Sequence, residues 1–206
     1  MEITLLDKLF LALTAVTAIY LIYRFWEFKP KGYLWYTLSF TVLIVAGALM
    51  LFGGFDVLGQ KWVKVVATLI PFGIAIGLIV QYYYDYRWYW IIVLLLGFVL
   101  IALNVYGVIG GKIWYPIFHS IAGLTIFFVP IFANSKKGAP GAVLWVTVGG
   151  ALIGIGGIAL AFLGAGKPLL GIFTAEVIFT ILTPLLLLMT LSYTWGFVKT
   201  MKLTEA

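Results

Sequence analysis

The sequence predicts an all-α integral membrane protein: a single domain, residues 1–206, built as a bundle of seven transmembrane helices. Hydrophobic residues make up 64% of the chain and charged residues 10%, whereas a soluble domain is typically about 45–50% apolar and roughly 25% charged. The apolar residues form seven continuous stretches of about 20 residues, the length that a helix needs to cross a bilayer. Because the connections between the stretches are short, consecutive helices are expected to lie antiparallel.

The seven expected spans follow one another along almost the whole chain. The last one is the longest, and we expect it to tilt or to extend past the membrane. The spans are placed near Leu5–Phe25, Tyr33–Phe52, Trp62–Val80, Trp88–Val108, Ile113–Ala133, Ala142–Leu163 and Leu170–Val198.

The lysines and arginines predict the orientation, because cytoplasmic loops carry an excess of these residues. Eight of them lie on the side of the C-terminus and five on the other, so the N-terminus is expected outside and the C-terminus in the cytoplasm of a prokaryotic cell. The net charge of +6 is expected to meet lipid headgroups and not nucleic acid. The eight are Arg24, Lys29, Lys31, Arg87, Lys136, Lys137, Lys199 and Lys202; the five are Lys8, Lys61, Lys64, Lys112 and Lys167.

Tyrosines and tryptophans gather at the predicted cytoplasmic side. Such rings anchor helix ends at the depth of the headgroups, and the alternative is an aromatic cage for a ligand. The rings are Trp26, Tyr33, Trp35, Tyr36, Tyr82, Tyr83, Tyr84, Tyr86, Trp88, Tyr89, Trp90 and Trp195. Together with the missing cysteine they also suit a thermophile.

Two ionisable residues lie well inside the expected spans, His119 and Glu176. Such residues are costly in hydrocarbon and mark functional sites by default. Each lies six residues into a span that begins on the predicted outer side, which puts both about 9 Å deep. Asn104 falls at a similar depth, so the three predict one polar site, a proton relay or a ligand site. The alternative is an interhelical hydrogen bond that only fixes packing.

The seventh span carries a polar stripe that begins at Glu176. Thr180 and Thr183 continue it on the same helical face, and Pro184 frees a backbone carbonyl near the middle of the helix. The stripe predicts a water-filled path, and the alternative is threonines bonded to their own helix. Asp7, near the start of the first span, is expected to be a solvated end residue.

Small residues form smooth faces on two spans. Such faces let helix backbones approach closely in lipid, so we expect them to pack inside the bundle or to form a homo-oligomer contact. They are Gly150, Gly154, Gly157 and Ala161 in the sixth span, and Gly73 and Gly77 in the third.

The residue inventory excludes several chemistries. The absence of cysteine excludes thiol chemistry and Cys-ligated metal sites, and a single histidine excludes bis-His haem within one chain and a His-rich zinc site. Seven spans with an outer N-terminus resemble the layout of the rhodopsin-like proteins, but the seventh span has no lysine before Lys199 to hold retinal. We expect no catalytic residues, no metal and no cofactor.

The sequence therefore predicts a small transporter or channel-like protein of the cytoplasmic membrane, with an outward-facing polar site for a proton, a cation or a small solute. Glu176 would bind the ion, His119 would titrate with it, and Asn104 would orient it. The alternative is a non-catalytic membrane subunit of a respiratory or secretory complex. The expected partners are the lipid bilayer and a second copy or other membrane subunits. A receptor-like sensor has no support beyond the number of helices.

Overall fold

The structure is a computed structural model that describes residues 3–111, 113–164, 170–172 and 174–205, without the side chains of 158–164 and 175. It is all-helical over these residues, with 87% helix and no strand. Six helices are long and apolar enough to cross a membrane, and a shorter apolar helix covers Gly141–Gly157. The helices are α1 (Leu5–Phe28), α2 (Tyr33–Gly53), α3 (Lys61–Ala67), α4 (Leu69–Tyr82), α5 (Arg87–Val105), α6 (Trp114–Lys137), α7 (Leu144–Gly164) and α8 (Ala175–Glu205), with 3-10 turns η1 (Phe55–Gly59), η2 (Tyr84–Tyr86) and η3 (Gly141–Val143).

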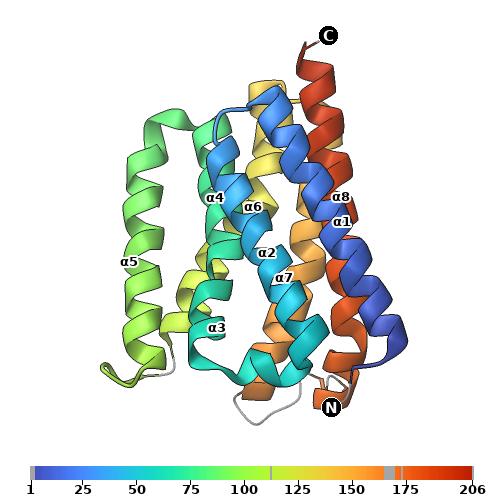
Figure 1. Cartoon of the computed structure of the whole chain (residues 1–206). Coiled ribbons are helices and arrows are strands. Elements are labelled where there is room, and N and C mark those ends of the chain that lie inside the picture. The colour runs from blue at the N-terminus through green and yellow to red at the C-terminus, as the bar shows by residue number, and fades with distance from the viewer. Residues whose placement is uncertain (1–2, 112, 165–169, 173, 206) are drawn as a thin grey trace.

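Six helices close into a ring and one stands outside it. Around the ring, α1 packs on α2, α2 on α4, α4 on α6, α6 on α7, α7 on α8, and α8 returns to α1. In the part of the chain that the structure describes, the remaining long helix, α5, packs mainly against α4, α6 and α3 and the adjoining turn η2. Figure 1 shows α5 at the edge of the bundle, and α1 and α8 together at the opposite edge. The end where α1, α4, α6 and α8 finish is called here the C-terminal end.

The third expected span is not one helix. The segment breaks at Thr68, between α3 and α4. Pro71 has no N–H to bond back to the carbonyl of Ala67, so the helical ladder is interrupted there. The hydroxyl of Thr68 donates to the carbonyl of Val65 over 2.7 Å and tightens the last turn of α3. The expected Trp62–Val80 span thus lies within Lys61–Tyr82, which is long and apolar enough to cross a membrane, but it is formed by two helices instead of one.

The inside of the ring is filled by aromatic rings towards the C-terminal end. Tyr36 from α2 stacks on Phe25 from α1 with 5.0 Å between ring centroids, and Phe197 from α8 lies 4.7 Å from Tyr36. Phe40 and Tyr193 add an edge-to-face pair at 6.0 Å. Tyr36 was expected in the interfacial belt, but it is fully buried. These contacts tie α1, α2 and α8 together.

Outside the ring the surface is strongly apolar. On α5, Trp88, Tyr89, Ile92 and Leu96 are all more than half exposed. An extended apolar surface of this kind requires a lipid or protein environment. Together with the long apolar helices, it fits a multi-pass membrane protein.

Candidate functional site

Asp7 takes part in a contact between the first helix, α1, and the last helix, α8. It is the third residue of α1, where Thr4 and Asp7 form a reciprocal capping box. Its second carboxylate oxygen accepts a hydrogen bond from the hydroxyl of Thr183 in α8, over 2.6 Å. Asp7 is 9% exposed and Thr183 is fully buried. The expectation of a solvated end residue is wrong, because α8 packs along α1 and covers this turn.

His119 points towards α7. Its ring stacks on Tyr115 one turn earlier, with 5.5 Å between centroids. A Cβ added at Gly157 would lie 3.0 Å from Nε2, so the glycine makes room for the ring. Nδ1 is buried and has no hydrogen-bond partner among the described residues. The histidine therefore sits between α6 and α7.

The other predicted site residues lie elsewhere. Glu176 is exposed in the first turn of α8, and Thr180 is exposed and donates to the backbone carbonyl of Glu176 over 2.8 Å. Asn104 donates to the carbonyls of Ile109 (3.1 Å) and Gly111 (2.6 Å), and so closes the turn after α5. Within the part of the chain that the structure describes, no hydrogen bond or ion pair joins His119, Glu176 and Asn104. Equal depth in the bilayer does not decide which way each helix face turns.

The glycine pair of α4 contacts α2. A Cβ at Gly73 would lie 2.7 Å from the carbonyl oxygen of Trp35, and one at Gly77 would overlap the ring of Tyr36. Ser39 also bridges the two helices, since its hydroxyl lies within hydrogen-bond distance of the carbonyls of Trp35 (3.1 Å) and Leu69 (3.3 Å).

The glycines of α7 face two neighbouring helices, α6 and α8. Gly150 faces Ile126 of α6, on the same side as Gly157, which faces His119. Gly149 and Gly156, which the sequence analysis did not single out, face Tyr193 and Leu185 of α8. A Cβ at Gly154 would meet nothing within 4 Å. The side chain of Ala161 lies outside the described residues.

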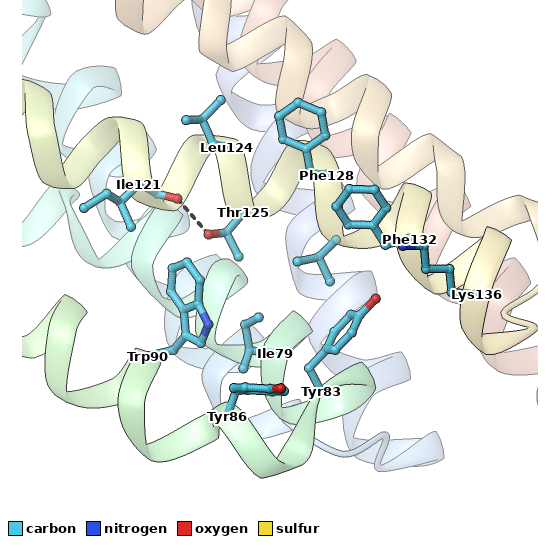
Figure 2. A pocket seen from close by; sticks show the side chains of 11 residues that line it. Ile79, Tyr83, Tyr86, Trp90, Ile121, Leu124, Thr125, Phe128, Phe132 and Lys136 are labelled. Atoms are coloured by element: carbon cyan, nitrogen blue, oxygen red, sulfur yellow. Dashed lines mark hydrogen bonds between the residues drawn. The ribbon is translucent and has the colours of Figure 1, made fainter.

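A groove opens between α4, α5 and α6. It has a volume of about 570 Å³, within the roughly 300–1,000 Å³ of ligand sites. Figure 2 shows Trp90 and Ile79 on one side, Ile121 and Thr125 on the other, and Phe132 with Lys136 at one end. The hydroxyl of Thr125 donates to the carbonyl of Ile121 over 2.7 Å, so it offers no free donor. The lining is formed by Ile79, Tyr83, Tyr86, Trp90, Ile121, Leu124, Thr125, Phe128, Val129, Phe132 and Lys136.

Three basic side chains lie at or beside the C-terminal end of this groove, each over an aromatic ring. Lys136 lies 5.3 Å from the ring centroid of Phe132, and Lys137 lies 5.3 Å from that of Tyr83. The guanidinium carbon of Arg87 lies 3.7 Å from the centroid of Tyr84. Cation–π contacts of this kind orient a positive charge without neutralising it.

Sequence reasoning noted the aromatic residues of the groove but did not bring them together. Tyr83, Tyr86 and Trp90 belong to the predicted belt, for which a ligand cage was the alternative. Phe128 and Phe132 give a usable signal, because residues four apart share one face of a helix. That face could not be paired with α5 from sequence.

Three or more His, Cys, Asp or Glu side chains do not gather into a metal-binding group anywhere in the described ranges. Comparison with known proteins found that no family model matches this chain, and that no curated protein and no solved structure matches it either.

Proposed function

We propose that this chain is a membrane-embedded binding protein that takes the hydrocarbon chain of a phospholipid into the groove between α5 and α6. The groove carries the proposal, because it is an open channel of about 570 Å³ with apolar walls and a lysine at one end. A pocket with these properties is the default place to look for a ligand.

The groove lies where a lipid could enter it sideways. Leu124, Phe128 and Phe132 line it and are all exposed on α6, so this wall reaches the outer surface of the bundle. Ile79 and Val129 are buried at its floor. A ligand could therefore move in from the surrounding leaflet without crossing water.

The length of the groove suits an acyl chain. From Ile121 to Lys136, the lining follows α6 over 16 residues, or about 22 Å at the rise of an α-helix. One leaflet contributes roughly half of the 30 Å hydrocarbon core. A chain lying along α6 would thus span its leaflet, with the headgroup near Lys136.

Filling the groove tests the proposal. Val129→Phe adds a ring at the floor, whereas Val148→Phe adds the same ring on α7 at a site that is 42% exposed. Both variants are purified in mild detergent, and the phospholipid that remains bound is counted by native mass spectrometry. We expect the first variant to lose retained lipid and the second to keep it.

Equal lipid retention by the two variants would contradict the proposal. If Val129→Phe does not fold, Leu124→Trp places the bulk on the exposed wall instead, with Leu188→Trp on α8 as its control, since both leucines are more than half exposed.

Transport of a proton or a small cation is the second candidate, and the contact between Asp7 and Thr183 favours it. Asp7 offers a carboxylate covered by α8 near one end of the bundle, bonded to the predicted polar stripe of α8. In this proposal Asp7 takes the ion-binding role first given to Glu176. In vesicles with a pH gradient, uptake of the proton or small cation should be lost in Asp7→Asn and kept in Glu176→Gln. The opposite result would return the ion-binding role to Glu176.

A further inference from the structure

Four basic residues from three parts of the chain, called here the basic cluster, contact aromatic rings of the groove or of the turn η2 beside it. Lys31 follows α1, Arg87 begins α5, and Lys136 and Lys137 end α6. Tyr84 connects two of them, because Lys31 lies 5.5 Å and Arg87 3.7 Å from its ring centroid.

The cluster keeps its positive charge. Over the described residues the ion pair present is Arg24–Glu27, at 2.9 Å, and it involves none of the four basic side chains. Asp85, in η2, is the acidic residue that lies among them in sequence, and it forms no ion pair in this part of the structure. Four cations against one carboxylate give the basic cluster a net positive charge beside the groove, and Lys136 brings part of it into the lining.

The cluster and the groove share residues. Lys136 is itself part of the lining, and Lys137 lies over the ring of Tyr83, which also lines the groove. Lysines in the last turn of α6 also offset the negative end of the helix dipole, but that role requires neither an aromatic partner nor a position on a groove.

We infer that the groove selects an anionic phospholipid, with its phosphate between Lys136 and Lys137 and its acyl chain along α6. This inference rests on the proposed function and adds the class of headgroup. Basic residues near the membrane surface attract anionic lipid, and here the aromatic rings hold them beside an apolar channel. Tyr83, which lines the groove, lies beside this position, since its ring centroid is 5.3 Å from the ammonium of Lys137.

The test compares two double variants with the same change of charge at the same end of the bundle. Lys136→Gln with Lys137→Gln removes the two lysines of the groove, and Lys199→Gln with Lys202→Gln removes two exposed lysines of α8. Each protein is equilibrated with mixed vesicles of phosphatidylglycerol and phosphatidylcholine, and the retained lipid is identified by native mass spectrometry. We expect the wild type and the α8 variant to favour phosphatidylglycerol by about tenfold, and the α6 variant by less than about threefold.

Each other outcome overturns a different statement. If the wild type retains both lipids equally, the inference on the headgroup fails while the proposed binding of a hydrocarbon chain stands. If both double variants lose the preference alike, the selectivity belongs to the general surface charge and not to the groove. If the wild type retains no lipid, the proposed function itself fails.

Discussion

Thr183 of α8 donates a hydrogen bond from its hydroxyl to the carboxylate of Asp7 in α1, over 2.6 Å, and so joins residues 176 positions apart. The other carboxylate oxygen of Asp7 accepts from the backbone N–H of Thr4 over 3.0 Å and from its hydroxyl over 2.6 Å. Each oxygen of the buried carboxylate therefore has a donor. The contact is one of those that join the first and last helices, which also pack along one another.

Replacing Thr183 by valine should weaken the contact between α1 and α8. Valine keeps the shape but removes the donor, and interhelical hydrogen bonds in membranes contribute about 1 kcal/mol. We expect the free energy of unfolding in detergent to fall by about that amount. Thr17→Val is the control, because the hydroxyl of Thr17 bonds only to the Leu13 carbonyl of its own helix. A loss of the same size in both variants would mean that the contact with Asp7 adds nothing.

Gly77 should not tolerate a methyl group. A Cβ there would overlap the ring of Tyr36, and overpacking a dense core typically costs about 1–3 kcal/mol. Gly47→Ala in α2 is the matched control, because an added Cβ meets nothing within 4 Å. Thermal unfolding of Gly77→Ala in detergent should shift downwards, while Gly47→Ala should keep or raise the transition temperature, since alanine favours a helix. A stable Gly77→Ala protein would show that α2 and α4 can move apart freely.

Alanine substitutions at two glycines of α7 should also differ in their effect on stability. At Gly149 a Cβ would lie 2.7 Å from the ring of Tyr193 and 3.1 Å from the carbonyl oxygen of Met189, whereas at Gly154 it would meet nothing. Since backbone atoms cannot give way as a flexible side chain can, we expect Gly149→Ala to lower stability by about 1–3 kcal/mol and Gly154→Ala to leave it unchanged. Denaturant unfolding of the two variants side by side measures the difference. The sequence analysis singled out Gly154 and not Gly149. If Gly154→Ala lowers stability more than Gly149→Ala does, the packing face expected from the sequence is favoured.

Replacing His119 by phenylalanine should leave stability nearly unchanged. A phenyl ring keeps the stacking on Tyr115, and it removes a ring nitrogen that is buried without a hydrogen-bond partner among the side chains that the structure describes. We expect a change within about 0.5 kcal/mol, measured by thermal unfolding in detergent. A loss well above that value would reveal a hydrogen bond to Nδ1, for example from a bound water, and would bring the polar site back to His119.

The helices could be read from the sequence, and so could most of their ends. The expected Tyr33–Phe52 span is within one residue of α2. The last helix begins five residues later than expected and runs to Glu205, because a helix in water can continue past the hydrocarbon through polar residues such as Lys199 and Lys202. The break at Thr68 was missed, although Pro71 was a visible signal for it.

The candidate sites were harder to predict. The sequence predicts one depth for His119 and Glu176, but one points between α6 and α7 and the other is exposed on α8. Asp7 looked like a helix end in contact with water, because only the packing of α8 along α1 buries it. The groove joins residues of α4, α5 and α6, and neither its floor nor its basic end is continuous in the sequence.

The sequence by itself determined that the chain forms long apolar helices, because in hydrocarbon every backbone N–H and C=O must be satisfied within the segment. It also determined which end of the bundle carries most basic and aromatic residues. Only the tertiary structure decided which faces meet: that α5 lies outside the ring, that Thr183 reaches Asp7, and that Lys136 stands at the mouth of a groove. Helices that are apolar all round carry little information on their rotation, since lipid is as apolar as the interior of the bundle.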